Sequence, residues 1–311
     1  MTLAPIILFV YNRPWHTQQT VKALQDCELA AESDLYIFAD GPKKDASDET
    51  RQKIAEVRQY IHTIDGFKSI HIQESPTNKG LANTVIQGVS DVIDKHGKVI
   101  VVEDDIVAHP FFLRFMNDAL EFYEEDSRIF MIGGFNSIFR IPRWYTKDVF
   151  IVHRSCSWGW GMWKNRWGLA DWSVSDFDKF INDPKQVNLF NRGGNDMAPM
   201  LSAQMAKEID SWAIRWDYCM FKHNGYCLHS RYSLVENLGF DEFGIHCTNL
   251  SHLNIPASFP KEKYNIRLVK NIKFYREIES NFKKYNDNTH YIPFIKKLKR
   301  LVKRHLCLYN R

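Results

Sequence analysis

Three consecutive acids, Glu103-Asp104-Asp105, are the strongest chemical feature of the sequence. They directly follow Val99 to Val102, an apolar run that predicts a buried strand. Three neighbouring carboxylates repel one another, so a bare cluster costs free energy that a divalent cation would remove. Hard oxygen ligands suit Mg²⁺ or Mn²⁺, which proteins commonly hold with one or two carboxylates plus substrate phosphates. A solvated acidic turn is the alternative that the local sequence leaves open.

Two other polar residues follow apolar runs in the same way. Arg13 comes just after Ile6 to Val10, and Asp40 comes directly after Leu35 to Ala39. A guanidinium at such a place suits a phosphate or a nucleotide base, but it equally suits a surface ion pair. The carboxylate of Asp40 suits a ribose or a base edge, whereas Asp40-Gly41 is also a common turn pair.

Asp210 stands beside Ser211-Trp212 at a helical position. A carboxylate against an aromatic wall suits a general base. An exposed helix acid or a helix N-cap is the alternative. The rival acids are Asp196, Asp217, Asp241 and Glu242. His246 lies near Cys247 and His252, but this spacing fits no standard zinc site, so we consider it only as a single metal ligand or phosphate contact.

Short apolar runs alternate with longer amphipathic segments over the first 135 residues, and these elements must position the polar side chains. The strands are expected at Ile6 to Val10, Leu35 to Ala39, Ser69 to Ile72, Val99 to Val102 and Ile129 to Ile132, with helices near 15–28, 48–62, 80–94 and 110–124. Pro14 and Pro110 stand where first-turn prolines are favoured. This alternation predicts an α/β fold with a mainly parallel central sheet. Ligands bind beyond the carboxyl ends of such strands, so the polar strand ends are expected to form one site.

The character of the sequence changes after residue 136. Six tryptophans fall between 144 and 172, and core packing is expected for most of them. Gly159 and Gly161 favour a loop around Trp160, in which aromatic faces would cover a sugar ring. A helical stretch is expected from about 197 to 223.

Charge is unevenly distributed along the 311 residues. The net charge is +4, but residues 261–311 carry 15 Lys and Arg against 4 Asp and Glu, or +11, which leaves −7 for the first 260. Apolar side chains at helical spacing between 294 and 306, with Lys and Arg on the other face, are typical of a helix lying in a membrane interface. A docked helix with a solvated basic face is the alternative. The aromatic residues lie outside the basic run, so no nucleic-acid partner is expected.

Several function classes are disfavoured by what the sequence does not contain. No apolar run reaches the length of a membrane-spanning helix, and the apolar stretch at the N-terminus is too short for a signal peptide. The fingerprints of P-loop, dinucleotide-binding and serine-hydrolase sites do not occur. The six scattered cysteines suggest reduced thiols in a cytosolic protein.

Together, the motifs between Pro5 and about His246 resemble the GT-A glycosyltransferases, in particular the bacterial relatives of N-acetylglucosaminyltransferase I. The matching pieces are Ile7-Leu8-Phe9-Val10-Tyr11-Asn12-Arg13-Pro14, Phe38-Ala39-Asp40-Gly41, Asn78-Lys79-Gly80-Leu81-Ala82, Val102-Glu103-Asp104-Asp105 with Pro110-Phe111-Phe112, Trp158-Gly159-Trp160 with Trp163, and Ile209-Asp210-Ser211-Trp212. The resemblance implies a GT-A, Rossmann-like fold with helices on both faces of the sheet, followed here by the basic amphipathic helix.

The resemblance also implies roles for the matching residues. Arg13 and Asp40 would contact the nucleotide, Asp104 would hold the ribose, and Lys79 and Trp160 would belong to the nucleotide-sugar site. Asp105 would bind Mn²⁺ or Mg²⁺, with His246 as a weaker metal ligand, and Asp210 would be the catalytic base. Two departures are that the acid pair usual before the tryptophan is here Asp210-Ser211, and that no histidine matches near Gln87.

The function expected from these features is a metal-dependent inverting transfer of a sugar, taken as N-acetylglucosamine, from a UDP-sugar to a hydroxyl group. The acceptor would be a glycan or a lipid-linked oligosaccharide in the synthesis of a surface polysaccharide. The enzyme would be cytoplasmic and peripheral on the inner face of the plasma membrane, with its C-terminal helix on anionic lipid. A sugar-phosphate nucleotidyltransferase and a non-catalytic sugar- or nucleotide-binding protein are the alternatives. The expected divisions are a nucleotide-sugar-binding half at 1–135, an acceptor half at 136–255, and a basic tail at 256–311.

Overall fold

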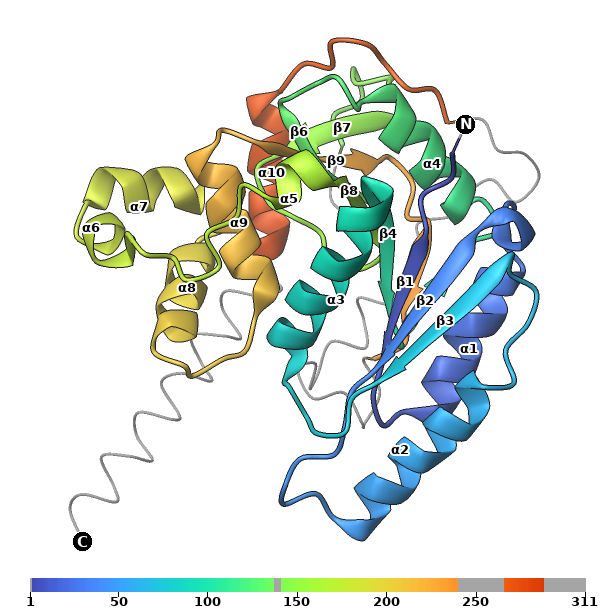
Figure 1. Cartoon of the computed structure of the whole chain (residues 1–311). Helices are drawn as coiled ribbons and strands as arrows, with labels where there is room; N and C mark the ends of the chain where they lie inside the picture. Colours follow the sequence, from blue (N-terminus) through green and yellow to red (C-terminus); the bar gives the residue numbers. More distant parts are fainter. Residues whose placement is uncertain (1, 137–140, 240–265, 288–311) are drawn as a thin grey trace, which may run out of the picture.

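An eight-stranded sheet forms the centre of the molecule in the computed structural model, which describes residues 2–136, 141–239 and 266–287 (Figure 1). The strand order is β3-β2-β1-β4-β8-β6-β9-β7. The bounds are β1 (Ile6–Val10), β2 (Asp34–Ala39), β3 (Ser69–Glu74), β4 (Lys98–Glu103), β6 (Ile129–Gly133), β7 (Val149–Val152), β8 (Trp160–Trp163) and β9 (Tyr226–Ser230). Only β8 and β7 run opposite to the other six, so the expected α/β fold with a mainly parallel sheet is confirmed.

Helices cover both faces of this sheet. Their bounds are α1 (Pro14–Gln25), α2 (Asp48–Ile61), α3 (Leu81–His96), α4 (Phe112–Phe122), α5 (Lys164–Trp167), α6 (Phe177–Ile181), α7 (Pro184–Phe190), α8 (Met197–Met205), α9 (Trp212–Lys222) and α10 (Arg276–Asn286). Alternate side chains of a strand point to opposite faces. In β1, Ile6 and Leu8 accordingly join a core with α1, α2 and α4, whereas Ile7 and Phe9 join a second core with α3 and α9.

The elements expected in the first 135 residues are confirmed within a few residues of their predicted ends. Pro14 is in the first turn of α1 as expected. Pro110 is not within a helix, because α4 begins at Phe112 and its N-cap is Phe111. The single helical stretch expected at 197–223 is wrong, since α8 ends before Lys207, whose φ is +59°, and the side chain of Ser211 caps a new helix, α9.

The expectation of a loop around Trp160 is also wrong. Residues Trp160–Trp163 form β8, which pairs antiparallel with both β4 and β6. Gly161 belongs inside this strand because a Cβ atom there would lie 3.1 Å from the carbonyl oxygen of Val99 and 3.2 Å from the side chain of Leu120. The glycine therefore permits close packing between β8 and its neighbours rather than a turn.

The second half of the chain completes the same sheet and adds a helical layer beside it. Helix α10 packs Ile278 and Phe282 against Tyr145, Phe150 and Val152. The cysteines among the described residues (27, 156, 219 and 227) are unpaired and buried, as expected of reduced thiols. Within the described ranges, no helix combines the length and the apolar character needed to cross a bilayer. His246, the boundary expected between residues 255 and 256 and the basic helix expected at 294–306 lie outside the described residues.

Candidate active site

The polar ends of β1 and β4 meet through Arg13. These strands are parallel neighbours, with Phe9 paired to Glu103, so the residues that follow them emerge at one edge of the sheet. The Arg13 guanidinium donates from Nη2 to Asp104 and from Nη1 to Asp105 Oδ2, the latter at 3.0 Å. The hydroxyl of Thr20 in α1 donates to the backbone oxygen of Asp104 at 2.8 Å, which fixes the turn after β4. The fold thus brings the Arg13 guanidinium together with the carboxylates of Asp104 and Asp105, as the sequence predicts.

Negative charge exceeds positive charge at this edge. Burial and the neighbouring carboxylates raise the pKa of Glu103, and burial also raises the pKa of Asp104 although Arg13 opposes this shift. Burial disfavours the charged form of Arg13, but Asp104 and Asp105 outweigh burial and raise its pKa. Trp212 hydrogen-bonds the side chain of Glu103. One guanidinium faces three acids, so a further cation would lower the repulsion.

Asp105 has one carboxylate oxygen without a hydrogen-bond partner in the described residues. This atom, Oδ1, is buried, and a bound cation would supply the partner that it lacks within the described part of the protein. The same range contains no cluster of three or more metal-binding side chains. Mg²⁺ does not need such a cage, because it usually keeps waters and binds one or two carboxylates with substrate phosphates. Asp105 would therefore hold the ion together with the diphosphate.

A short two-stranded sheet closes over Asp105. Strand β10 (Val235–Asn237) pairs antiparallel with β5 (Ile106–Ala108), and Leu238 N donates to the backbone oxygen of Asp105 at 2.8 Å. A Cβ atom at Gly239 would collide with Asp105 Oδ2. Gly239 is a site residue that the sequence analysis missed, since a lone glycine carries no signal without its spatial neighbours.

Asp40 organises the loop before α3. Its carboxylate accepts from the backbone N–H of Gly41 at 2.8 Å and of Lys79 at 3.0 Å, and from Asn78 Nδ2 at 2.9 Å. Asp40 is buried, and these donors occupy both carboxylate oxygens. We therefore interpret Asp40 as a residue that positions the loop from Asn78 to Gly80, and the exposed Lys79 side chain as the part of the loop that faces solvent.

Asp210 touches the same loop from the other side. Its Oδ2 accepts from Ala82 N in the first turn of α3 at 3.2 Å, and a Cβ atom at Gly80 would lie 2.8 Å from Oδ2. The carboxylate is exposed, and Ser211, not Asp210, is the N-cap of α9. Asp40 and Asp210 thus both contact the segment that leads into α3. Trp212, two residues after Asp210, hydrogen-bonds Glu103.

Trp160 lies behind these residues. It is fully buried in β8, and its ring centre is 4.7 Å from that of Trp212. We interpret Trp160 as support for Trp212 rather than as a surface that a ligand touches. The contact between Trp212 and Glu103 forms only in the folded structure, so the motif Ile209-Asp210-Ser211-Trp212 gives no signal of it.

Comparisons with known proteins find only distant structural likeness. No protein-family model matches the chain, and no curated protein matches it. A structure of S. aureus TarS 1–349 is 10% identical with a TM-score of 0.40, covering 76% of this chain and 61% of that one. UDP-glucose pyrophosphorylase complexed with UDP-glucose is 8% identical (TM-score 0.36, 74% and 91% covered), and an active-site mutant of LgtC is 12% identical (0.35, 57% and 65%). At these values none of the three assigns a function to this chain.

Proposed function

We propose that the chain is a metal-dependent inverting glycosyltransferase that moves a sugar from a UDP-sugar to an acceptor hydroxyl. The observation that carries the proposal is the arrangement of the acids. Asp105 presents an unpartnered buried oxygen beside Arg13, and the exposed carboxylate of Asp210 lies at the start of α3, two residues before Trp212, which hydrogen-bonds Glu103. A cation-binding carboxylate and a separate basic carboxylate are the two groups that such a transfer requires.

Each residue of the proposed site would have its own role in the transfer. Asp105 holds Mn²⁺ or Mg²⁺, which when bound stabilises the charge that develops on the leaving diphosphate. Arg13 supplies a fixed positive charge for the nucleotide, and the exposed side chain of Lys79, in the loop held by Asp40, would supply a second. Asp210 accepts the proton of the acceptor hydroxyl, whose oxygen bonds to the anomeric carbon from the opposite face as the carbon–oxygen bond to the diphosphate breaks. Its Oδ2 is held by Ala82, which fixes the direction of the carboxylate.

The finer parts of the proposal come from the sequence resemblance and from charge. N-acetylglucosamine is the proposed sugar, and a glycan or lipid-linked oligosaccharide is the proposed acceptor. The basic amphipathic segment after residue 292 would hold the enzyme on anionic lipid at the inner face of the membrane. Each basic residue near such lipid contributes about 1 kcal/mol.

Donor binding is the first test. The melting temperature is measured against a panel of nucleotide sugars with and without Mn²⁺, because a ligand that binds only the native state raises it. We expect a rise with one UDP-sugar that requires Mn²⁺ and is lost in Asp105→Ala. Asp45→Ala, an exposed acid in the loop after Asp40, is the matched control.

The same protein is then incubated with UTP and sugar 1-phosphates. Pyrophosphate release would favour a nucleotidyltransferase over our proposal. Donor binding without turnover on any glycan or lipid-linked acceptor would favour a binding protein. Deleting residues 292–311 tests the membrane part, which fails if membrane sedimentation and activity on a lipid-linked acceptor are both unchanged.

A further inference from the structure

A cavity lies at the C-terminal end of α3, away from Asp210 at its N-terminal end. It has a volume of about 570 Å³ and is formed by the last turns of α3, by α5 and by the segment that follows α5. This volume is within the range of small-molecule sites. Since α3 rises 1.5 Å per residue, Ser90 and Asp94 lie about 12 and 18 Å along the axis from Ala82. The cavity is therefore separate from the proposed donor site.

Aromatic side chains form one wall of this cavity. Trp167 and Trp172 line it, with ring centres 4.5 Å apart. Trp172 is half-buried, whereas Trp167 is buried and donates from Nε1 to Ser90 Oγ at 2.9 Å. Behind them the ring of Trp216 lies 5.5 Å from that of Trp167. Rings packed in this way have little freedom, so the exposed part of Trp172 is a rigid apolar surface.

The loop that carries Trp172 is fixed by its neighbours. Asp171 accepts from the backbone N–H of Ser173 at 3.0 Å and of Ser175 at 2.7 Å. Arg215 of α9 donates to the backbone oxygen of Trp172 at 3.1 Å. The backbone on both sides of the ring is thus held in place before any ligand arrives, which lowers the entropy cost of binding.

Polar groups line the rest of the cavity. Asp94 and Glu124 contribute carboxylates and Asn165 an amide. Lys164 also lines it, but its ammonium group is paired with Asp94 Oδ1 at 3.1 Å. Two acids against one paired lysine leave a net charge of −1, which disfavours a phosphate or an anionic lipid. A neutral ligand rich in hydroxyl groups fits, because the carboxylate oxygens accept from hydroxyl donors. The Asn165 oxygen already accepts from Arg166 Nη1 at 2.7 Å, which leaves its NH₂ group as a donor to a ligand hydroxyl.

We propose that this cavity binds a neutral sugar ring of a glycan. The C–H face of a pyranose ring would pack on the exposed face of Trp172, whose π-cloud is partly negative. Hydroxyl groups at the ring edge would donate to Glu124 and Asp94. This second carbohydrate site does not rest on the proposed transfer reaction, because binding there needs neither donor nor metal. In a transferase it would retain a glycan chain away from the reacting end.

Calorimetric titration with three neutral tetrasaccharides tests the proposal: maltotetraose, chitotetraose and β-1,4-galactotetraose. We expect at least one to bind the full-length protein, and we expect saturating UDP with Mn²⁺ to leave that binding unchanged. Trp172→Ala should weaken it by about tenfold, the effect of losing one well-placed aromatic contact. Trp144→Ala is the matched control, because Trp144 is an exposed tryptophan that lies against α10 instead.

A second pair of variants guards against misfolding of Trp172→Ala. Glu124→Ala removes an exposed carboxylate that lines the cavity, and Glu125→Ala removes its exposed neighbour, which does not. Only the first should weaken binding. Absence of binding for all three tetrasaccharides, displacement of the bound sugar by UDP, or equal affinity in Glu124→Ala and Glu125→Ala would each overturn the proposal.

Discussion

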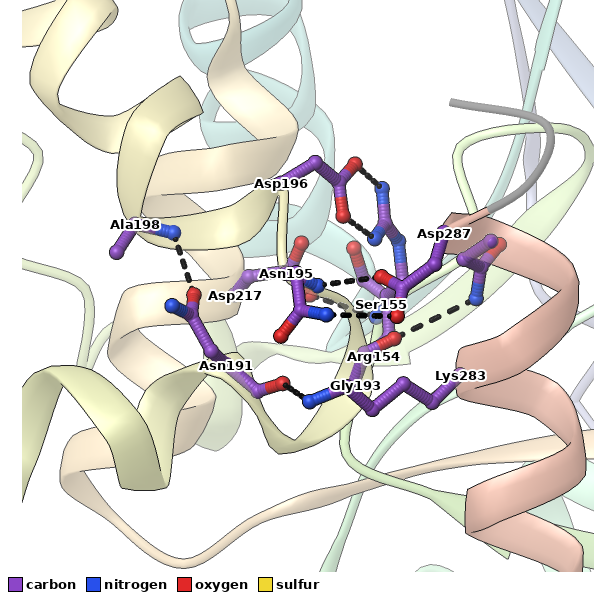
Figure 2. Close-up of polar contacts among 11 residues, drawn as sticks. Arg154, Ser155, Asn191, Gly193, Asn195, Asp196, Ala198, Asp217, Lys283 and Asp287 are labelled. Atoms are coloured by element: carbon purple, nitrogen blue, oxygen red, sulfur yellow. Dashed lines mark hydrogen bonds and ion pairs between the residues drawn. The ribbon is translucent and has the colours of Figure 1, made fainter. Parts of the chain in front are cut away.

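Two regions of the molecule place an arginine between aspartates, and they differ in how completely the charges are satisfied. At the carboxyl edge of the sheet, Arg13 faces Asp104 and Asp105 beside Glu103, and Asp105 Oδ1 has no described partner. Beside α10, Arg154 donates to both carboxylate oxygens of Asp196 at 2.6 and 2.7 Å (Figure 2). The first region has an excess of acids and an open oxygen, whereas in the second each carboxylate is engaged.

The second region joins four parts of the chain. Asp217 of α9 accepts from Ser155 N at 2.6 Å, and Asp287, at the end of α10, accepts from the backbone and side chain of Asn195 at 2.7 and 2.8 Å (Figure 2). Lys283 donates to the backbone oxygen of Asn191 at 2.8 Å. We call these residues the α10 docking network. The acids around Arg13 are thus the ones proposed to bind a ligand, whereas the α10 docking network holds α10 against the rest of the fold.

The largest expected effect is on catalysis at the first region. Asp210→Asn keeps an oxygen that accepts from Ala82 but cannot take up a proton, so kcat should fall by about 100-fold or more. Glu208→Gln, an exposed acid in the same loop, is the control. The measurement is sugar transfer from the UDP-sugar identified by melting temperature. Retained activity in Asp210→Asn would remove this residue from the role of base.

The unfolding free energy should depend more on the second region than on the first. Asp196→Ala leaves Arg154 buried without its partner, which costs about 3–5 kcal/mol of unfolding free energy. Asp105→Ala removes one of several mutually repelling acids and leaves Arg13 paired with Asp104, so its unfolding free energy should be unchanged or higher. Urea denaturation of both variants makes the comparison. A larger loss in Asp105→Ala than in Asp196→Ala would break the distinction drawn between the two regions.

The effect of replacing Asp217 on the unfolding free energy should depend on pH. Burial raises the pKa of this carboxyl to about 6. The folded protein therefore keeps the proton while the unfolded chain releases it, and stability falls as pH rises from about 4 to 6. Asp217→Asn removes this dependence while its amide oxygen still accepts from Ser155. The unfolding free energy of Asp217→Asn minus that of the unmodified protein should be about 2 kcal/mol larger at pH 7.5 than at pH 4.

Asp171→Asn is the control for that pH series, because hydrogen bonds from Ser173 and Ser175 hold the pKa of Asp171 below its ordinary value. Its difference from the unmodified protein should not change between pH 5 and 7.5. Denaturant midpoints at four pH values suffice. A constant difference for Asp217→Asn over the whole range would contradict the shifted pKa of Asp217.

The smallest effect is expected at the end of α10. Asp287→Ala removes two hydrogen bonds from Asn195 at a half-buried position, and the loss of unfolding free energy should be about 1 kcal/mol. Lys284→Ala changes a neighbouring lysine of α10 that is not part of the docking network and should cost less. Hydrogen exchange of the backbone amides in 276–286 measures the local opening of α10 in each variant. Equal protection of α10 in both variants would show that Asp287 does not anchor the helix.

The sequence predicts the first half of the fold because its signals are local. Alternating apolar runs and first-turn residues define the elements, and parallel strands bring Arg13 and the acids after Val102 to one edge. Residues that act across the chain were harder to predict. The contact of Asp210 with Ala82 spans 128 positions and depends on where α9 begins, while β8 carries two tryptophans and a glycine whose meaning depends on the strands beside them.

The position of β8 has a consequence for how the protein is made. On the ribosome, β1 to β4 emerge first, but β4 stays an open edge until Trp160–Trp163 inserts between β4 and β6. Strand β6 likewise has no partner toward β4 before that moment. An open apolar edge invites pairing with other chains. Until β8 has left the ribosome, the nascent chain therefore exposes two unpaired strand edges, the condition in which a chaperone protects against aggregation.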